Sequence, residues 1–221
     1  MTAPRFGFLL LLAAAAVGCG MNPVSTRRAP PVEQSSTSPA STPEVLVKSP
    51  YAATLSTDRG DVRVVFYSDA EKTASNFVDL AVGNKTWTDP GTGQPVQRPY
   101  YDGTVIHRIM PDLLIQGGMS AVSKSTAAAT GPGYQFEDER RASRKFDKPG
   151  LVAMASSGPN SNGGQFFITL SPLPWLDGKH VIFGEVAKGL EVVREISRLK
   201  RDDDDRPLEP VTLRQVRIDY R

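Results

Sequence analysis

Residues 106–118 read Ile-His-Arg-Ile-Met-Pro-Asp-Leu-Leu-Ile-Gln-Gly-Gly, and the prediction of the fold starts from this stretch. Two short apolar runs, at 104–109 and 113–116, are separated by Pro111 and Asp112. Proline and aspartate favour turns, so the stretch predicts two short strands with a turn between them.

Runs of the same kind lie on both sides of this stretch. Upstream, residues 52–57 and 62–67 flank Asp58-Arg59-Gly60, a sequence typical of a tight turn. Downstream, further short apolar or alternating runs occupy residues 151–155, 165–170, 181–186 and 211–218. The chain therefore contains many short strands with turn residues between them.

Two helices are expected among these strands. In the first, at 70–82, four apolar residues fall on one face, Asp69 can cap the start and Gly83 can end it. Apolar residues at helical spacing mark the second, which begins near Leu190. Residues 83–102 are expected to form a long loop. Short strands with two isolated helices favour a closed or nearly closed antiparallel barrel over a βαβ fold.

The first residues resemble a bacterial export signal. A short positive region with Arg5 precedes the apolar run 6–17, which is too short to span a bilayer. The stretch 16–19, Ala-Val-Gly-Cys, resembles a lipobox, so residues 1–18 are expected to be a lipoprotein-type signal peptide and Cys19 to be lipidated. Several acyl chains would give stable anchoring at a membrane. The alternative is ordinary cleavage, with Cys19 incidental.

Residues 19–50 are rich in Ser, Thr and Pro and have few large apolar side chains, which predicts a disordered tether. The folded domain is expected to span residues 51–221. Of the whole chain, 39 % is hydrophobic and 23 % is charged, a profile typical of a globular protein. The net charge is +2, which predicts no attraction to nucleic acid. A single cysteine excludes a disulfide within the chain.

Three stretches carry a resemblance to a known family. They are 106–118, quoted above, 158–168, Gly-Pro-Asn-Ser-Asn-Gly-Gly-Gln-Phe-Phe-Ile, and 175–184, Trp-Leu-Asp-Gly-Lys-His-Val-Ile-Phe-Gly. In order and spacing they resemble the signature segments of cyclophilins, which are peptidyl-prolyl cis/trans isomerases. Shorter matches at 72–77 and 136–139 extend the resemblance over almost all of residues 52–220.

The resemblance implies a mainly β fold, a closed eight-stranded antiparallel β-barrel capped by two α-helices. It also implies a groove on the outer surface of the barrel that binds an X-Pro dipeptide, and no metal or organic cofactor. The partners it implies are proline-containing polypeptides. Together with the export signal, it predicts an enzyme that assists the folding of exported or cell-envelope proteins at the periplasmic or extracellular face. We expect a monomer whose only membrane contact is the lipid anchor.

By the same resemblance, Arg108 matches the family's catalytic arginine. The expected substrate-binding residues are Leu113, Leu114, Gln116, Ala155, Ser156, Ser157, Gln165, Phe167, Trp175, Leu176 and His180. Trp175 also matches the position associated with cyclosporin affinity, so cyclosporin binding is expected.

The sequence departs from the family pattern at three of these positions. The family usually has Phe and Met where this chain has Leu113 and Leu114, so the proline pocket stays apolar but loses an aromatic face. Ser156 stands where cyclophilins commonly have Asn. We expect activity, with a weaker rate or a shifted sequence preference.

Alternative interpretations remain for single residues and for the whole domain. Arg108 could be a surface arginine in an ion pair, and Leu113 and Leu114 could be ordinary core residues. His107 is expected to be structural, and the acidic run 202–205 to be a solvated loop rather than a metal site. The domain could also be a chaperone or scaffold with little turnover, or a small-molecule-binding barrel with a wide cavity. Large inward-facing residues instead predict a filled barrel.

Overall fold

The structure, a computed structural model, describes residues 49–121, 131–139 and 144–221. The predicted signal peptide, Cys19 and the tether up to residue 48 lie outside the described residues. None of the helices in the described ranges is long and apolar enough to cross a membrane. The strands and α-helices are β1 (Pro50–Thr57), β2 (Gly60–Phe66), α1 (Glu71–Val82), β3 (Trp87–Thr88), β4 (Pro95–Val96), β5 (Thr104–Ile106), β6 (Arg108–Met110), β7 (Leu114–Gly117), β8 (Met119–Ser120), β9 (Leu151–Met154), β10 (Phe166–Thr169), β11 (Ile182–Lys188), α2 (Leu190–Ser197) and β12 (Val211–Tyr220).

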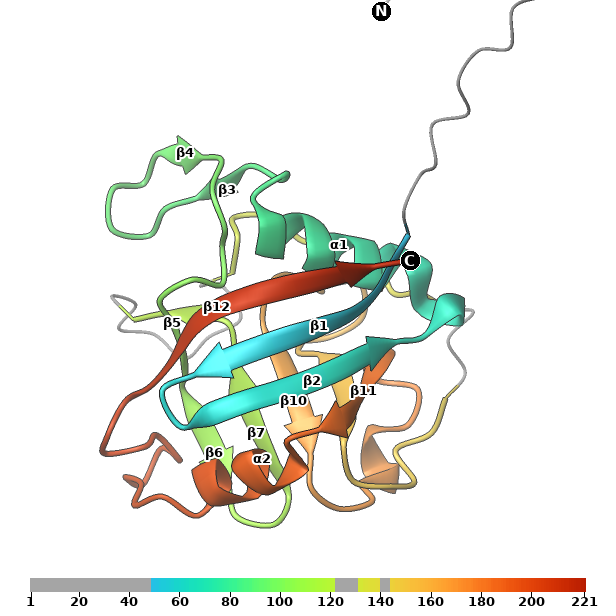
Figure 1. The fold of residues 1–221 in the computed structure, drawn as a ribbon, viewed down its shortest axis with the longest axis vertical. Helices are drawn as coiled ribbons and strands as arrows, with labels where there is room; N and C mark the ends of the chain where they lie inside the picture. Colours follow the sequence, from blue (N-terminus) through green and yellow to red (C-terminus); the bar gives the residue numbers. More distant parts are fainter. Residues whose placement is uncertain (1–48, 122–130, 140–143) are drawn as a thin grey trace, which may run out of the picture. The chain divides into compact units, whose positions relative to one another are not determined.

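The main sheet is antiparallel, with the strand order β6-β7-β10-β9-β11-β2-β1-β12-β5-β8 (Figure 1). Only His107 separates β5 from β6, and only Gly118 separates β7 from β8, so each pair is one bent strand. The first bent strand pairs with β12 through β5 and with β7 through β6, which joins the two ends of the sheet. Counted in this way, the main sheet of the described residues has eight strands that curl into a ring. The expected mainly β, cyclophilin-like fold with two α-helices is confirmed.

The inside of the ring is packed with side chains. Ile109, Ile115, Ile168 and Val152 lie opposite one another on four neighbouring strands and are all buried. From α1, the ring of Phe77 packs on three aromatic rings with centroids 4.6–5.8 Å away, those of Tyr101, Phe166 and Phe183. The other helix, α2, contacts β2, β6 and β7. This packing is that of a filled barrel, as predicted.

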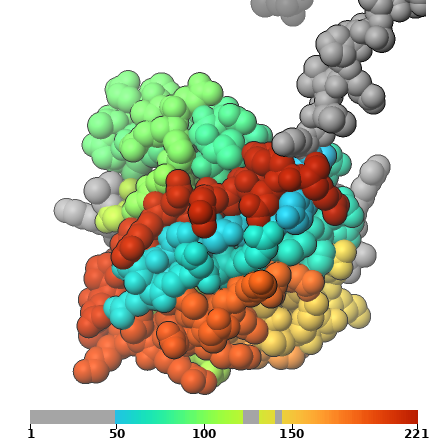
Figure 2. Space-filling model, viewed as in Figure 1, coloured from blue at the N-terminus to red at the C-terminus, as the bar shows by residue number. Residues whose placement is uncertain are grey.

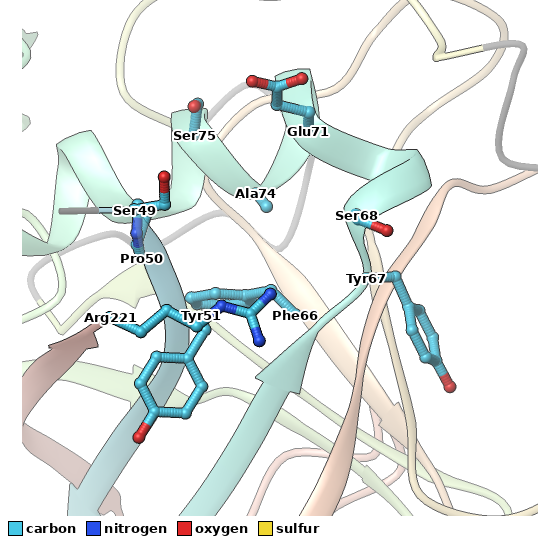
Figure 3. Close-up of a pocket in the computed structure, with 10 residues that line it drawn as sticks. All are labelled: Ser49, Pro50, Tyr51, Phe66, Tyr67, Ser68, Glu71, Ala74, Ser75 and Arg221. Carbon is cyan, nitrogen blue, oxygen red and sulfur yellow. The ribbon is translucent and has the colours of Figure 1, made fainter. Parts of the chain in front are cut away.

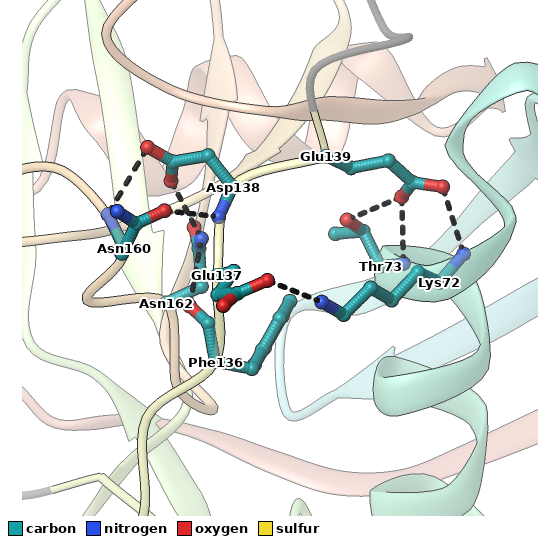
Figure 4. Close-up of polar contacts among 8 residues, drawn as sticks. All are labelled: Lys72, Thr73, Phe136, Glu137, Asp138, Glu139, Asn160 and Asn162. Atoms are coloured by element: carbon teal, nitrogen blue, oxygen red, sulfur yellow. Dashed lines mark hydrogen bonds and ion pairs between the residues drawn. The ribbon is translucent and has the colours of Figure 1, made fainter.

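The start of α1 differs from the prediction that Asp69 caps it. The residue at the N-cap is Ala70, which makes no side-chain capping bond, and Asp69 instead accepts a hydrogen bond from Arg144 at 3.1 Å. Two main-chain amides of the first turn, those of Lys72 and Thr73, donate to the carboxylate of Glu139 at 3.0 and 2.9 Å (Figure 4). The same carboxylate accepts the Thr73 hydroxyl at 2.7 Å. A distant residue therefore takes the place of the local cap.

At the other end of α1, the prediction is confirmed. Gly83 adopts a left-handed conformation with φ of +79° and its N–H donates to a carbonyl of the last turn. The long loop expected after it contains a small hairpin, β3 paired with β4. This segment stands out as a lobe at the top of the domain (Figures 1 and 2). Arg98 and Asp89 form an ion pair at 2.8 Å across the hairpin, and the Trp87 indole N–H donates to the Arg98 carbonyl at 2.9 Å.

Candidate active site

A row of side chains crosses the outer surface of the barrel. Arg108 on β6 lies opposite Gln116 on β7, Gln116 lies opposite Phe167 on β10, and Phe167 lies opposite Ala153 on β9. Directly opposite residues point to the same side of a sheet, and the neighbouring residues point to the other side. The neighbours, such as Ile109, fill the barrel, so the row from Arg108 to Ala153 faces outward.

The Arg108 side chain lies at the exposed end of this row. It is 44 % exposed and forms an ion pair with Asp205, with 3.4 Å between Nη2 and Oδ2. Asp205 belongs to the acidic run that the sequence predicted as a solvated loop. Asp202, Asp203 and Asp204 are exposed, but Asp205 is partly covered and meets the guanidinium. Arg108 is therefore an ion-paired surface arginine, which was the alternative interpretation. It also lies at the end of the outward-facing row, so the ion pair does not exclude a role in the site.

Two glutamines lie behind the arginine. The Gln116 amide donates from Nε2 to Oε1 of Gln165 at 2.9 Å. Gln165 is 3 % exposed, and its main-chain carbonyl accepts the N–H of Ala155 at 2.9 Å. A planar amide can donate and accept at once, so the pair can bind a substrate carbonyl while keeping its own contact.

Next to the glutamines is an apolar cluster distinct from the barrel core. Its buried members are Phe146, Leu151, Ala153, Phe167, Leu173 and Ile182, and its partly buried ones include Leu113, Leu114, Ala155 and Leu176. The Phe167 ring stacks on Phe146 at 5.7 Å between centroids and meets the His180 ring edge-on at 5.3 Å. The cluster thus joins Phe167 to four other expected substrate-binding residues, Leu113, Leu114, Ala155 and Leu176. Leu113 and Leu114 are half-buried on the outside, which is not a barrel-core position.

His180 and the serines form the polar edge of this cluster. Ser156 Oγ lies 3.1 Å from His180 Nδ1, and the Ser157 N–H donates to Ser161 Oγ at 2.9 Å. Burial lowers the pKa of His180 below its ordinary 6.5, so the ring is neutral at neutral pH and its contribution is shape and hydrogen bonding. Trp175 is 58 % exposed.

His107 is adjacent in sequence to Arg108 but is 4 % exposed. Burial lowers its pKa from 6.5 to about 4. The main-chain N–H of His107 donates to the main-chain carbonyl of Gln116 at 3.0 Å, at the bend between β5 and β6. This arrangement agrees with the structural role that the sequence predicted.

The loop before Gln165 is held by side chains that sequence reasoning did not identify. Asp138 and Asn160 exchange hydrogen bonds between their side chains and main-chain amides, both at 3.0 Å (Figure 4). Asn162 donates to Asp138 at 2.8 Å. Because Glu139 also binds the first turn of α1, residues 136–139 tie that helix to the loop at 158–164. The sequence signals for this network are the short match at 136–139 and the longer match at 158–168, which contains Asn160 and Asn162.

Two glycines allow the same loop to pack closely against Gly118 and Tyr100. A Cβ on Gly118, whose φ is +83°, would lie 2.7 Å from the carbonyl oxygen of Gly164. A Cβ on Gly164 would lie 2.7 Å from the Tyr100 ring. Side chains cannot be accommodated at these separations without a shift, so glycine is required for this close packing next to Gln165.

A separate hollow of about 330 Å³ lies between the start of α1, β1, β2 and Arg221 (Figure 3). Tyr51, Phe66 and Tyr67 contribute aromatic side chains to its wall. None of its lining residues is a predicted site residue. The candidate site is therefore the row and its apolar cluster, on other strands.

The family model described as cyclophilin type peptidyl-prolyl cis-trans isomerase/CLD matches residues 52–218. The chain belongs to the cyclophilin family. This cyclophilin is a peptidyl-prolyl cis-trans isomerase, and its substrates are proline-containing peptides.

Its relatives include bacterial peptidyl-prolyl cis-trans isomerases. It is 44 % identical to peptidyl-prolyl cis-trans isomerase B of Streptomyces anulatus, over 76 % of this chain and 97 % of that protein. It is 43 % identical to peptidyl-prolyl cis-trans isomerase A of Mycobacterium tuberculosis, over 75 % and 91 %. It resembles the crystal structure of a Cryptosporidium parvum cyclophilin, solved in the presence of the dipeptide Ala-Pro, with a TM-score of 0.62 and 29 % identity over 77 % of this chain and 99 % of the other.

Proposed function

We propose that the row formed by Arg108, Gln116 and Phe167, with the apolar cluster beside it, is where this isomerase binds and rotates an X-Pro bond. One observation supports this most strongly: a guanidinium, two amides and an apolar surface lie side by side on the outside of the barrel. An extended peptide can reach this surface without entering the barrel.

The reaction requires little chemistry from the protein. The barrier to rotation of a peptide bond is about 18–20 kcal/mol and arises from the partial double bond between C and N. Twisting the bond removes this resonance and returns a lone pair to the prolyl nitrogen. A group that donates a hydrogen bond to that nitrogen stabilises the twisted state more than either planar state, and each ~1.4 kcal/mol of this preference gives a tenfold rate increase.

The residues of the site can divide this work among them. Arg108 supplies the donor, because its guanidinium is always charged and rigidly forked. Gln116 and Gln165 hold the substrate carbonyl. Phe167 and its apolar neighbours hold the proline ring, and His180 with Ser156 forms the edge of the pocket. No residue needs to act as a base, which agrees with the lowered pKa of His180.

The test is the isomerisation rate of an X-Pro peptide, followed without a coupled protease. Arg108→Ala is expected to lower kcat/KM at least about tenfold, while Arg214→Ala, at an exposed position on β12, is expected to leave it unchanged. A wild-type rate for Arg108→Ala would contradict the proposed role. A binding assay on the same variants separates an isomerase from a scaffold, because a scaffold would bind peptide with a rate near the uncatalysed one.

We also propose that Trp175 gives this protein affinity for cyclosporin. Trp175 is 58 % exposed, so a ligand can reach this residue, and an indole N–H is a hydrogen-bond donor. Trp175→Phe keeps an aromatic ring, although a smaller one, and removes the N–H donor, so it is expected to weaken inhibition by cyclosporin more than it lowers peptide isomerisation. Equal inhibition of both proteins would contradict the proposal.

Finally, we propose that the enzyme acts in the cell envelope on exported clients, as a monomer anchored by lipid at Cys19. The support is the apolar run 6–17 before Cys19 and the Ser-, Thr- and Pro-rich segment after it. With labelled palmitate, the wild-type protein is expected to carry label and to sediment with membranes, and Cys19→Ser to do neither. An unlabelled wild-type protein in the soluble fraction would contradict the anchor.

A further inference from the structure

The loop between α2 and β12 places one carboxylate beside Arg108 and holds it there through the backbone. The main-chain carbonyl of Asp205 accepts the N–H of Ile109, the residue after Arg108, at 2.8 Å. Asp205 itself has φ of +62°, a left-handed conformation that few residues adopt, and its N–H donates to the Asp202 carbonyl at 3.1 Å. The position of Asp205 is therefore fixed by contacts that do not involve the guanidinium.

The loop also supports itself through Asp202. Oδ1 of that residue accepts the main-chain N–H groups of Asp204 at 3.0 Å and of Arg206 at 2.8 Å. An isolated bridge between Arg201 and Pro207 closes the base of the loop. A loop built in this way can present a side chain in a fixed direction without a contribution from the substrate.

The Asp205 carboxylate uses its two oxygens for two different arginines. Oδ1 accepts from Nε of Arg201 at 3.0 Å, which fixes the plane of the carboxylate, and Oδ2 faces Nη2 of Arg108 at 3.4 Å. Within the described part of the chain, Asp205 is the only residue whose side chain is paired with Arg108. Among the described residues, the guanidinium is thus held at one nitrogen, which leaves its other N–H groups for a substrate.

We propose that Asp205 is a positioning residue for catalysis: it holds the guanidinium of Arg108 in the direction of the substrate row. This inference rests on the proposed role of Arg108. An arginine side chain has many rotamers, and a carboxylate that restricts them before the substrate arrives lowers the entropy lost in the twisted state. Asp205 does not touch the substrate and acts only through Arg108.

The left-handed backbone of Asp205 determines which variants are informative. Asp205→Gly removes the carboxylate and keeps the backbone conformation, since glycine adopts positive φ readily. Asp205→Asn also tolerates this conformation and keeps an oxygen acceptor without the charge. Asp203→Asn is the matched control, because it removes a charge from the same loop at an exposed residue for which the structure gives no hydrogen bond or ion pair.

The experiment measures the melting temperature and kcat/KM for an X-Pro peptide. Each variant is made twice, once in the protein with Arg108 and once combined with Arg108→Ala. With Arg108 present, Asp205→Gly is expected to lower kcat/KM about two- to fivefold, Asp205→Asn to lower it less, and Asp203→Asn to leave it unchanged. Melting temperatures are expected to stay close together, because a half-exposed ion pair contributes little to stability. In the Arg108→Ala background, Asp205→Gly is expected to have no further effect on the rate.

Three outcomes would overturn the positioning role and leave that of Arg108 intact. The first is an unchanged kcat/KM for Asp205→Gly although Arg108→Ala is slow. The second is an equal loss of kcat/KM when Asp205→Gly is made in the Arg108 and in the Arg108→Ala protein. The third is a higher kcat/KM for Asp205→Gly, which would mean that the carboxylate restrains the arginine. A wild-type rate for Arg108→Ala alone would overturn the proposed function, and this inference with it.

Discussion

Stability at mildly acidic pH should depend on His107. This residue is 4 % exposed, and burial lowers its pKa from 6.5 to about 4. Between these two values the unfolded chain binds a proton that the folded protein does not bind. The free energy of unfolding therefore falls as the pH falls through this range, and it is independent of His107 well above pH 6.5.

The size of the effect follows from the two pKa values. At ~1.4 kcal/mol per pH unit, the difference between 6.5 and about 4 corresponds to an upper limit of about 3 kcal/mol. Between pH 7 and pH 4.5, linkage predicts a loss of about 2 kcal/mol from this residue. Such a loss is a large part of the stability of an ordinary domain.

Urea unfolding of the purified protein at pH 7 and pH 4.5 measures this loss. His107→Asn has no titrating ring, so its difference in unfolding free energy between the two pH values should be smaller than that of the wild type by about 2 kcal/mol. The chain has one other histidine, His180, and His180→Asn serves as the control that should keep most of the wild-type difference. An identical pH dependence in the wild type and His107→Asn would mean that His107 stays protonated to the same extent in the folded and unfolded states.

Three further predictions concern the cap of α1, the proline pocket and the glycine contact. Glu139→Ala should lower the free energy of unfolding by about 1 kcal/mol, because two helix amides lose their acceptor. Glu137→Ala, at an exposed residue, should change it little, and equal shifts of the urea midpoint for the two variants would contradict the role of Glu139 as a cap. Leu113→Phe should lower KM for X-Pro peptides about twofold or more, because an aromatic face is added beside the apolar cluster, and an unchanged KM would place residue 113 away from the substrate. Gly164→Ala should lower the free energy of unfolding by about 1–3 kcal/mol, because its Cβ would lie 2.7 Å from the Tyr100 ring; wild-type stability would mean that the ring moves freely.

Local patterns predicted most of the elements, because side-chain alternation and helical spacing are properties of short segments. The strand expected at 211–218 is β12, and the helix expected at 70–82 is α1 with Gly83 at its end. The closure of the barrel was expected from the resemblance. Its physical basis, a strand that bends at His107 so that its two halves pair with different neighbours, requires pairings over long distances in the sequence.

The parts of the site that local patterns missed are contacts between distant segments. Asp69 is a reasonable cap by position, yet Glu139, 67 residues after Lys72, accepts the helix amides. Asp205 looked like part of a solvated acidic run, yet it meets Arg108 from 97 residues away. In both cases the packing of loops brings the two partners together, and no periodic pattern in the sequence predicts such a contact.

The on-enzyme exchange rate between the cis and trans forms of a bound X-Pro peptide is the decisive test of the proposed role of Arg108. Two-dimensional exchange NMR measures this rate separately from affinity. For Arg108→Ala, we expect both isomers to bind with affinities within about twofold of the wild type, because the apolar cluster is unchanged, and the exchange rate to fall at least about tenfold. If the peptide exchanges as fast on Arg108→Ala as on the wild type, the guanidinium does not lower the barrier to rotation.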